Sequence, residues 1–191
     1  TQILVDTSAI IDGRILDVAE TGFLTTKLSV PQFILDELWH IADSNDSIRR
    51  NRGRRGLEIL NQLMSDPNTS LHILPASPYD GTDADVRLIE FAKRLRASIF
   101  TTDYNLNRVA EIHGIQVLNV NELANALRPV VLPGEEMSIR VVQEGREAGQ
   151  GVGFLEDGTM VVVENGKRLM NKTVDVAVTR ILQTAAGRIV F

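Results

Sequence analysis

The order of the apolar runs constrains the fold of this chain more than any other feature. Over residues 1–128, short apolar runs alternate with longer segments in which apolar residues recur at helical spacing. This alternation predicts an α/β domain in which helices cover a mainly parallel sheet. The expected strands are residues 3–5, 28–30, 71–74, 98–102 and 115–120, and the expected helices are residues 8–20, a segment from Pro31 through Ile41, and residues 47–65, 83–96, 105–113 and 121–127.

The helical spacing disappears after residue 128. Residues 129–134, which contain two prolines and a glycine, are interpreted as a linker. Beyond it, the dipeptides Asp157-Gly158 and Asn165-Gly166 indicate tight hairpins between short strands. We therefore expect one domain over residues 1–128 and a small antiparallel, OB-like barrel over residues 135–191. The strands expected in the barrel are residues 139–142, 152–155, 160–163, 174–179 and 189–191.

Four acidic residues stand where an α/β fold carries its chemistry. Asp6 and Asp103 each end an apolar run, and open α/β sheets bind ligands beyond the carboxyl ends of their strands. Glu37 and Asp85 interrupt the apolar faces of two expected helices, whereas Asp36 falls on a solvent face. Carboxylates that converge without basic partners require a cation. The four acids therefore predict a metal-dependent hydrolase.

Each acid also has a structural interpretation. Asp6 or Asp103 could cap a helix, Glu37 could pair with an arginine, and Asp85 could interact with the dipole of its helix. Ser8 could orient a carboxylate or a metal-bound water, or it could cap a helix. The secondary candidates for the site are Ser8, Asp12 and Asp83, of which the two acids are more typical of caps or rim charges.

The composition limits the type of metal. The chain has no cysteine, and its three histidines are scattered, so disulfides and thiolate sites are excluded and a zinc site is disfavoured. A carboxylate cluster suits hard cations such as Mg²⁺ or Mn²⁺. No apolar run reaches the roughly 18–20 residues of a transmembrane helix, and the sequence shows no signal peptide.

A net charge of −5 gives the chain no general attraction for nucleic acid, but its basic residues are unevenly distributed. Residues 49–55 contain five arginines, which could contact phosphates. A solvated helix end or a surface for an acidic partner are the alternatives. The arginines are Arg49, Arg50, Arg52, Arg54 and Arg55.

The four acids, in this order and on these elements, resemble the PIN-domain nucleases. The matching segments are residues 5–8, Glu37, residues 85–92 and residues 101–103. Through residues 149–164 and 182–188, the C-terminal part resembles a TRAM domain, an RNA-binding barrel. With the segment Arg-Gly-Arg-Arg-Gly-Leu at 52–57, the whole chain is similar to the bacterial PIN–TRAM proteins.

This resemblance implies cleavage of single-stranded RNA with Mg²⁺ or Mn²⁺. Asp6 and Asp103 are expected to bind the metal directly, and Glu37 and Asp85 to complete the site directly or through water. In the barrel, Phe154 could stack a base, although an aromatic residue in a strand is more typical of a core. The basic residues expected to bind RNA there are Lys167, Arg168 and Lys172.

The same resemblance bears on partners and location. Proteins of this group usually carry transmembrane helices before the PIN domain, and this chain begins abruptly at Thr1. We expect a cytoplasmic protein, placed at the cytoplasmic face of the membrane in its full-length form. Single-stranded RNA is the expected partner, and a homo-oligomer is left open.

Three other functions fit the sequence. One is a non-catalytic RNA-binding or regulatory protein with a vestigial acidic site. Another is a phosphatase that uses Asp6 as a covalent nucleophile, but such enzymes usually carry a second acid two residues later, where this chain has Ser8. The third is a folded fragment that needs assembly or further sequence for activity.

Overall fold

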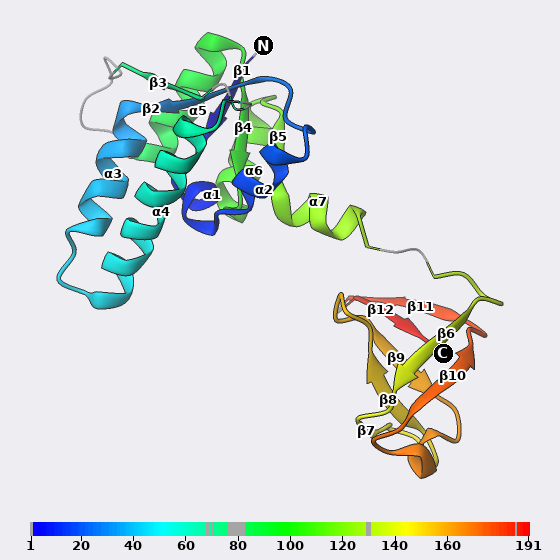
Figure 1. The fold of residues 1–191 in the computed structure, drawn as a ribbon. Coiled ribbons are helices and arrows are strands. Elements are labelled where there is room, and N and C mark those ends of the chain that lie inside the picture. The colour runs from blue at the N-terminus through cyan, green and yellow to red at the C-terminus, as the bar shows by residue number, and fades with distance from the viewer. Residues whose placement is uncertain (1, 68, 70, 76–82, 129–130, 186) are drawn as a thin grey trace. The chain divides into compact units, whose positions relative to one another are not determined.

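The chain divides into two compact units, residues 1–126 and residues 127–191 (Figure 1). The computed structural model describes residues 2–67, 69, 71–75, 83–128, 131–185 and 187–191. Each unit has its own apolar core. Among the described helices, none is both long enough and apolar enough to cross a membrane.

The first unit is built on a five-stranded sheet in the order β3-β2-β1-β4-β5 (Figure 1). All four strand pairs are parallel, as the apolar runs predict. The chain moves outward from β1 through β2 to β3 and then crosses back to β4, so the strand order reverses between β1 and β4. Ligand sites of open α/β sheets lie at such a switch point. The strands are β1 (Gln2–Val5), β2 (Lys27–Pro31), β3 (Leu71–Leu74), β4 (Ser98–Thr101) and β5 (Val117–Asn119).

Helices occupy the connections between these strands. Helices α1 to α4 pack against one another, α5 contacts β1, and α6 contacts β4 and β5. The single helix expected over residues 8–20 is two helices, because Gly13 adopts a left-handed conformation with φ 88° and ends α1. The helices are α1 (Thr7–Asp12), α2 (Arg14–Glu20), α3 (Gln32–Ala42), α4 (Ser47–Ser65), α5 (Ala84–Leu95), α6 (Tyr104–Ile112) and α7 (Val120–Ala126).

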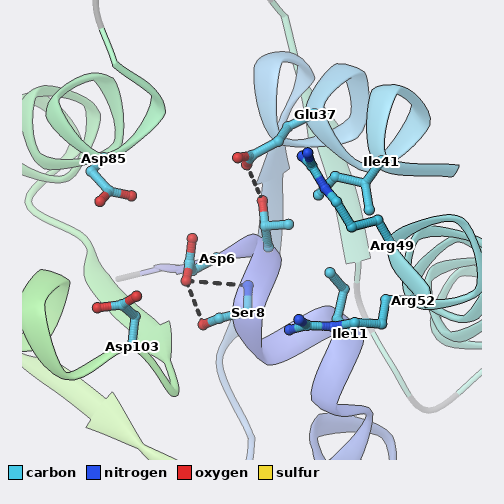
Figure 2. Close-up of a pocket in the computed structure, with 10 residues that line it drawn as sticks. Asp6, Ser8, Ile11, Glu37, Ile41, Arg49, Arg52, Asp85 and Asp103 are labelled. Atoms are coloured by element: carbon cyan, nitrogen blue, oxygen red, sulfur yellow. Dashed lines mark hydrogen bonds between the residues drawn. The ribbon is translucent and has the colours of Figure 1, made fainter. Parts of the chain in front are cut away.

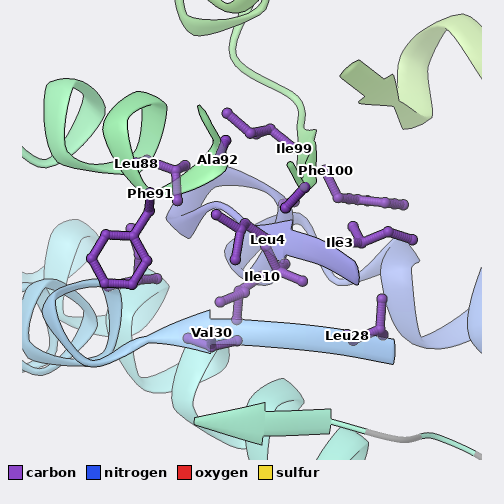
Figure 3. Packing of buried hydrophobic residues seen from close by; sticks show 14 of the residues in the cluster. Ile3, Leu4, Ile10, Leu28, Val30, Leu88, Phe91, Ala92, Ile99 and Phe100 are labelled. Atoms are coloured by element: carbon purple, nitrogen blue, oxygen red, sulfur yellow. The ribbon is translucent and has the colours of Figure 1, made fainter. Parts of the chain in front are cut away.

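The core of this unit forms around β1, whose residues Ile3 to Val5 are buried. Burial of their apolar surface is the main force that holds the helices on the sheet. Side chains from the neighbouring strands and from α1 and α5 pack around them (Figure 3). The side chains labelled there are Ile3, Leu4, Ile10, Leu28, Val30, Leu88, Phe91, Ala92, Ile99 and Phe100.

Two glycines fix the position of α4. A Cβ atom on Gly53 would lie 2.2 Å from the backbone nitrogen of Ala42, so the backbones of α3 and α4 are in direct contact there. A Cβ atom on Gly56 would lie 2.6 Å from Cδ2 of Leu38. Both glycines are buried, and their face of α4 continues toward Leu60 and Leu63, which are also buried.

The second unit consists of two small sheets around the buried residues Ile139, Val141, Val161, Val163, Val178 and Val190. One sheet pairs β10 with β6, and the other has the order β11-β12-β9-β8-β7. This small all-β unit is the expected class of fold. Its elements are β6 (Glu136–Arg140), β7 (Gln143–Glu144), β8 (Gly151–Phe154), β9 (Met160–Val163), the 3₁₀ helix η1 (Gly166–Leu169), β10 (Thr173–Ala177), β11 (Ile181–Thr184) and β12 (Gly187–Val190).

Several details of this unit differ from expectation. The Asp157-Gly158 turn does join the antiparallel strands β8 and β9. Asn165-Gly166, however, leads into η1, because β9 pairs with β8 and β12 instead of β10. The β12–β9 pair is parallel, so the unit is not purely antiparallel. Strands β7 and β11 were not predicted, because β7 has only two residues and β11 contains polar Gln183 and Thr184.

Candidate active site

The carboxyl ends of β1 and β4 face a pocket of about 300 Å³. All four predicted acids line it, and each comes from a different part of the chain (Figure 2). Asp85 and Asp103 lie on one side of the pocket, and Asp6 lies in the middle. The other side is formed by Glu37, Arg49 and Arg52. The lining residues are Asp6, Thr7, Ser8, Ile11, Glu37, Ile41, Arg49, Arg52, Asp85 and Asp103.

A network of hydroxyl groups holds the Asp6 carboxylate. The Ser8 hydroxyl donates to Oδ2 of Asp6 at 2.6 Å, and the Thr101 hydroxyl donates to the same oxygen at 2.9 Å. Asp6 also caps α1, because Oδ2 accepts the backbone N–H of Ser8 at 3.3 Å. Among the described residues, Oδ1 of Asp6 has no hydrogen-bond donor. The cap interpretation is therefore correct for Asp6, and it leaves one carboxylate oxygen available to a ligand.

The carboxylate of Asp103 is also held by a helix cap. As the N-cap of α6, its Oδ1 accepts the backbone N–H groups of Asn105 at 2.7 Å and Leu106 at 3.0 Å. Its own N–H donates to the hydroxyl oxygen of Thr101 at 2.9 Å, which connects it to Asp6. Within the described part of the chain, Oδ2 of Asp103 receives no hydrogen bond. Thr101 of β4 thus contacts the carboxylate of Asp6 and the backbone of Asp103.

Glu37 reaches the pocket from α3. The Thr7 hydroxyl donates a short hydrogen bond to Oε2 of Glu37. Asp36, the preceding residue, is exposed and accepts a hydrogen bond from Gln32, as its solvent-facing position predicts. No ion pair joins Glu37 to a described arginine or lysine, so the arginine-pair interpretation of this residue is wrong for the described residues.

Asp85 experiences the charge of the other acids. The residue as a whole is exposed, yet partial loss of hydration raises the pKa of its carboxyl group to about 6. Loss of hydration is the largest cause of this rise to about 6, and repulsion from Asp6, Asp83, Asp103 and Glu37 supplies the rest of it. The Asp85 carboxyl thus resists ionisation beside the other acids of the pocket, and a bound cation would relieve this repulsion.

This pKa gives a prediction for stability. A folded-state pKa of about 6, above the ordinary 3.8, means that the folded chain holds this proton more tightly than the unfolded chain. The stabilisation is complete below about pH 4 and is lost as the pH rises through 6. In the presence of a chelator, we expect Asp85→Asn to raise the melting temperature above that of the unaltered chain at pH 8, and the difference to shrink toward pH 4.5.

The control for this experiment is Glu90→Gln, which removes a charge from the same helix but on the side where Glu90 pairs with Lys93 at 3.0 Å. A melting-temperature difference between Asp85→Asn and the unaltered chain that does not change with pH would contradict the prediction. Thermal melts followed by the helical circular dichroism signal at several pH values provide the measurement.

Of the three secondary candidates for the site, only Ser8 lines the pocket. Ser8 lines the pocket and orients Asp6, but it is not a helix cap. Asp12 lies outside the pocket lining and pairs with Arg14, whose Nε lies 2.7 Å from Oδ1. The hydrogen bond from Arg14 holds the pKa of the Asp12 carboxyl below its usual range. Asp83 is the N-cap residue of α5 without a side-chain cap hydrogen bond, and it too is absent from the lining.

The five arginines of residues 49–55 have different environments. Arg50 donates to the backbone oxygen of Ser44 at 3.1 Å, and Arg55 donates to that of Asp12 at 3.1 Å. Arg49 and Arg52 line the pocket and extend toward it from α4 (Figure 2). Arg54 is exposed.

The basic residues predicted in the second unit lie at and after the 3₁₀ helix. Lys167 and Arg168 are in η1, Lys172 follows it, and all three are exposed. Lys167 pairs with Glu144 at 3.0 Å. The expectation that Phe154 belongs to the apolar core is wrong, because 44% of its surface is exposed at the end of β8.

The structure adds two residues that the sequence did not mark as functional. Thr7 orients Glu37, and Thr101 bridges Asp6 and Asp103. Both stand within the segments that carried the resemblance, directly after Asp6 and two residues before Asp103. In the part of the chain that the structure describes, no three His, Cys, Asp or Glu side chains are close enough to enclose a metal ion. Direct chelation would require the carboxylates to approach further.

Two protein-family models match the chain, PIN domain over residues 3–112 and TRAM domain over residues 130–190. It is 50% identical to the uncharacterized PIN and TRAM-domain containing protein YacL of Bacillus subtilis over 98% of this chain and 51% of that protein. A Synechocystis protein of the same description is 46% identical over 98% of this chain and 52% of its own length. The chain thus spans about half the length of these curated relatives.

Among solved structures, a domain of a functionally unknown protein from Methanocaldococcus jannaschii is similar, with a TM-score of 0.53 and 23% identity. The similarity covers 70% of this chain and 96% of that domain. At this level of identity, it supports the fold of the first unit.

Proposed function

Because this chain belongs to the PIN and TRAM-domain proteins, we propose that it is a metal-dependent endoribonuclease that hydrolyses single-stranded RNA in the acidic pocket. PIN domains are typically nucleases, and TRAM domains point to RNA. The observation that carries the proposal is the convergence of Asp6, Glu37, Asp85 and Asp103 on one pocket at the switch point of the sheet. The caps of α1 and α6 explain the positions of Asp6 and Asp103, but they do not explain why Glu37 and Asp85 line the same pocket, where like charges repel unless a cation or a reaction uses them.

The chemistry of the pocket fits a hard divalent cation. Its potential ligands are carboxylate and hydroxyl oxygens, without a thiol or imidazole among the lining residues. Mg²⁺ and Mn²⁺ prefer such ligands. The pKa of Asp85 is raised first by loss of hydration and then by repulsion from the neighbouring acids, and a bound cation would offset both effects. Asp6 and Asp103 are the best ligands, because each keeps one oxygen free of protein donors while the other is fixed.

When bound, such a cation stabilises negative charge on phosphate oxygens and lowers the pKa of a nearby water. The protein's own residues supply the geometry. Ser8 and Thr101 hold Asp6 in one orientation, Thr7 holds Glu37, and α6 holds Asp103 through its cap. These contacts limit the orientations of the three carboxylates, so once a cation has drawn the carboxylates together little further rearrangement would be needed.

RNA as the substrate class is supported by the combination of a PIN domain with a TRAM domain in this chain. We assign RNA binding to the second unit as well, where Phe154 is exposed and could stack a base, and where Arg168 and Lys172 are exposed.

The test is a comparison of substrates. A labelled single-stranded RNA, its duplex, and a single-stranded DNA of the same sequence are incubated with the chain in Mn²⁺, in Mg²⁺, and in a chelator. We expect cleavage of the single-stranded RNA with metal, no cleavage in the chelator, recovery when Mn²⁺ is added back, and much slower cleavage of the duplex.

Two outcomes would reject the proposal in different ways. Cleavage that persists in the chelator would eliminate a metal-dependent mechanism. Metal-independent binding of RNA without any cleavage would favour a non-catalytic RNA-binding protein with a vestigial acidic site. In that second case the pocket would be a remnant, and the second unit would carry the function.

A further inference from the structure

We propose that Arg49 and Arg52 bind the scissile phosphate inside the pocket and act in the cleavage step, whereas the other arginines of residues 49–55 do not. This inference rests on the proposed ribonuclease function and assigns to two residues a role in it. In the sequence, residues 49–55 look like one uniform basic surface. In the structure, the arginines of this segment have three different roles.

Arg50 and Arg55 already have structural contacts. The guanidinium of Arg50 binds the backbone oxygens of Ser44 and Asn45, at 3.1 and 3.4 Å, and thereby ties the turn between α3 and α4. The guanidinium of Arg55 binds the backbone oxygen of Asp12 at the end of α1. Both side chains therefore have structural partners that use part of their donor capacity.

Arg49 and Arg52 differ in this respect. Neither side chain makes a hydrogen bond or an ion pair with any described residue, although four carboxylates line the same pocket. The short ionic pairs of the described chain lie elsewhere, for example Arg14 with Asp12 and Arg108 with Glu111. Two guanidinium groups that face an acidic pocket without pairing to it retain all their donors for a ligand.

Arg49 and Arg52 lie on the face of α4 that carries its two buried glycines. Residues three and four apart lie on one side of an α-helix, so Arg49, Arg52, Gly53 and Gly56 share the side that packs on α3 and α1. The close contact of Gly53 with Ala42 fixes the rotation of α4 about its own axis. The side of α4 that carries Arg49 and Arg52 therefore faces the pocket. Arg54 lies about 140° around the helix from Arg49, away from the pocket.

The charges around the pocket are unevenly distributed. The side of the pocket formed by Asp85 and Asp103 is acidic and repels a phosphodiester, whereas Arg49 and Arg52 approach from the opposite side (Figure 2). A phosphodiester between the two sides would place its non-bridging oxygens toward the arginines. Guanidinium groups form two parallel hydrogen bonds with such oxygens, which fixes the orientation of the phosphate as well as its position.

Hydrolysis makes these contacts stronger during the reaction. A bond forms between phosphorus and the oxygen of one water, and the bond from phosphorus to the leaving ribose oxygen breaks. One proton of the water goes to the leaving oxygen, and the other stays on the new monoester or passes to solvent. Negative charge on the phosphate oxygens rises as the water adds, so donors aimed at them lower the barrier more than they strengthen binding.

The test compares Arg49→Gln, Arg52→Gln and the double variant with Arg54→Gln, which is the matched control on the far side of the same helix. Steady-state cleavage of single-stranded RNA with Mn²⁺ gives kcat and KM separately. We expect each pocket variant to lose about 100-fold in kcat, with little change in KM. Arg54→Gln should keep its kcat. Arg52→Lys should lose less activity than Arg52→Gln but stay below the unaltered chain, because lysine supplies charge without the paired geometry.

A second readout distinguishes this role from a structural one. Loss of a positive charge beside the carboxylates should leave Mn²⁺ binding by the RNA-free chain unchanged or make it tighter, whereas a collapsed pocket would bind Mn²⁺ more weakly. Pocket variants whose kcat stays within about threefold of Arg54→Gln would overturn this inference alone. If the unaltered chain cleaves no RNA, the proposed function itself fails, and the catalytic role of the arginines fails with it.

Discussion

Replacement of Asp6 by asparagine is expected to reduce Mn²⁺-dependent cleavage of single-stranded RNA by about 10²- to 10³-fold, which corresponds to a loss of about 3–4 kcal/mol of charge stabilisation. Asp6 is the most central acid of the pocket and is only 5% exposed. Asparagine has nearly the same shape and is a good N-cap, so α1 should form normally. The change removes a charge while it leaves the fold in place.

The control for this substitution is Asp36→Asn, which makes the same chemical change beside Glu37 but on the solvent side of α3. It should leave the rate within a fewfold of the unaltered chain. Initial rates at saturating metal, together with thermal melts of both variants, provide the measurement. An Asp6→Asn variant that is folded and fully active would show that this carboxylate does not serve the reaction.

Replacement of Gly53 by alanine is expected to destabilise the first unit by about 2 kcal/mol or more. The added methyl group would lie 2.2 Å from the nitrogen and 2.6 Å from the Cα of Ala42, and these backbone atoms can yield only if α3 and α4 separate. Alanine favours a helix over glycine by about 1 kcal/mol, which is too small to offset this overlap. Because α3 carries Glu37 and α4 carries Arg49 and Arg52, activity should fall as well.

Gly56→Ala provides a graded comparison on the same helix. Its methyl group would meet the tip of the Leu38 side chain at 2.6 Å, and a side chain can rotate where a backbone cannot. We therefore expect a smaller loss than for Gly53→Ala. Urea unfolding followed by the helical circular dichroism signal measures the first unit, because the described α-helices lie in it. Equal stability of Gly53→Ala and the unaltered chain would contradict direct packing of the two backbones.

The fold and the acids of the site follow from local patterns. Short apolar runs and apolar residues at helical spacing are properties of the local sequence. They were sufficient to predict the parallel sheet correctly. The same stripe assigned Glu37 to the pocket side and Asp36 to solvent, because helix geometry alone decides which face a residue occupies. Asp6 and Asp103 followed from the rule that strand ends meet at one edge.

The contacts between distant segments could not be predicted in this way. The bridge from Thr101 to Asp6 spans 95 residues, and nothing in either local sequence indicates it. The roles of the arginines depend on the rotation of α4, which Gly53 sets through its contact with Ala42. Pairing of β9 with β12 is equally non-local, so the Asn165-Gly166 hairpin was predicted where η1 forms. The break at Gly13 was local, but a single glycine is tolerated in many helices.

The proposed function requires that the acidic pocket cleave RNA with a metal. The most direct measurement is Mn²⁺-dependent cleavage of a labelled single-stranded RNA by the unaltered chain and by Asp103→Asn, purified and assayed side by side. Asparagine at this position retains the cap of α6, so folding should be preserved. We predict cleavage by the unaltered chain and at least about 100-fold slower cleavage by the variant. Equal cleavage by both proteins would contradict the account.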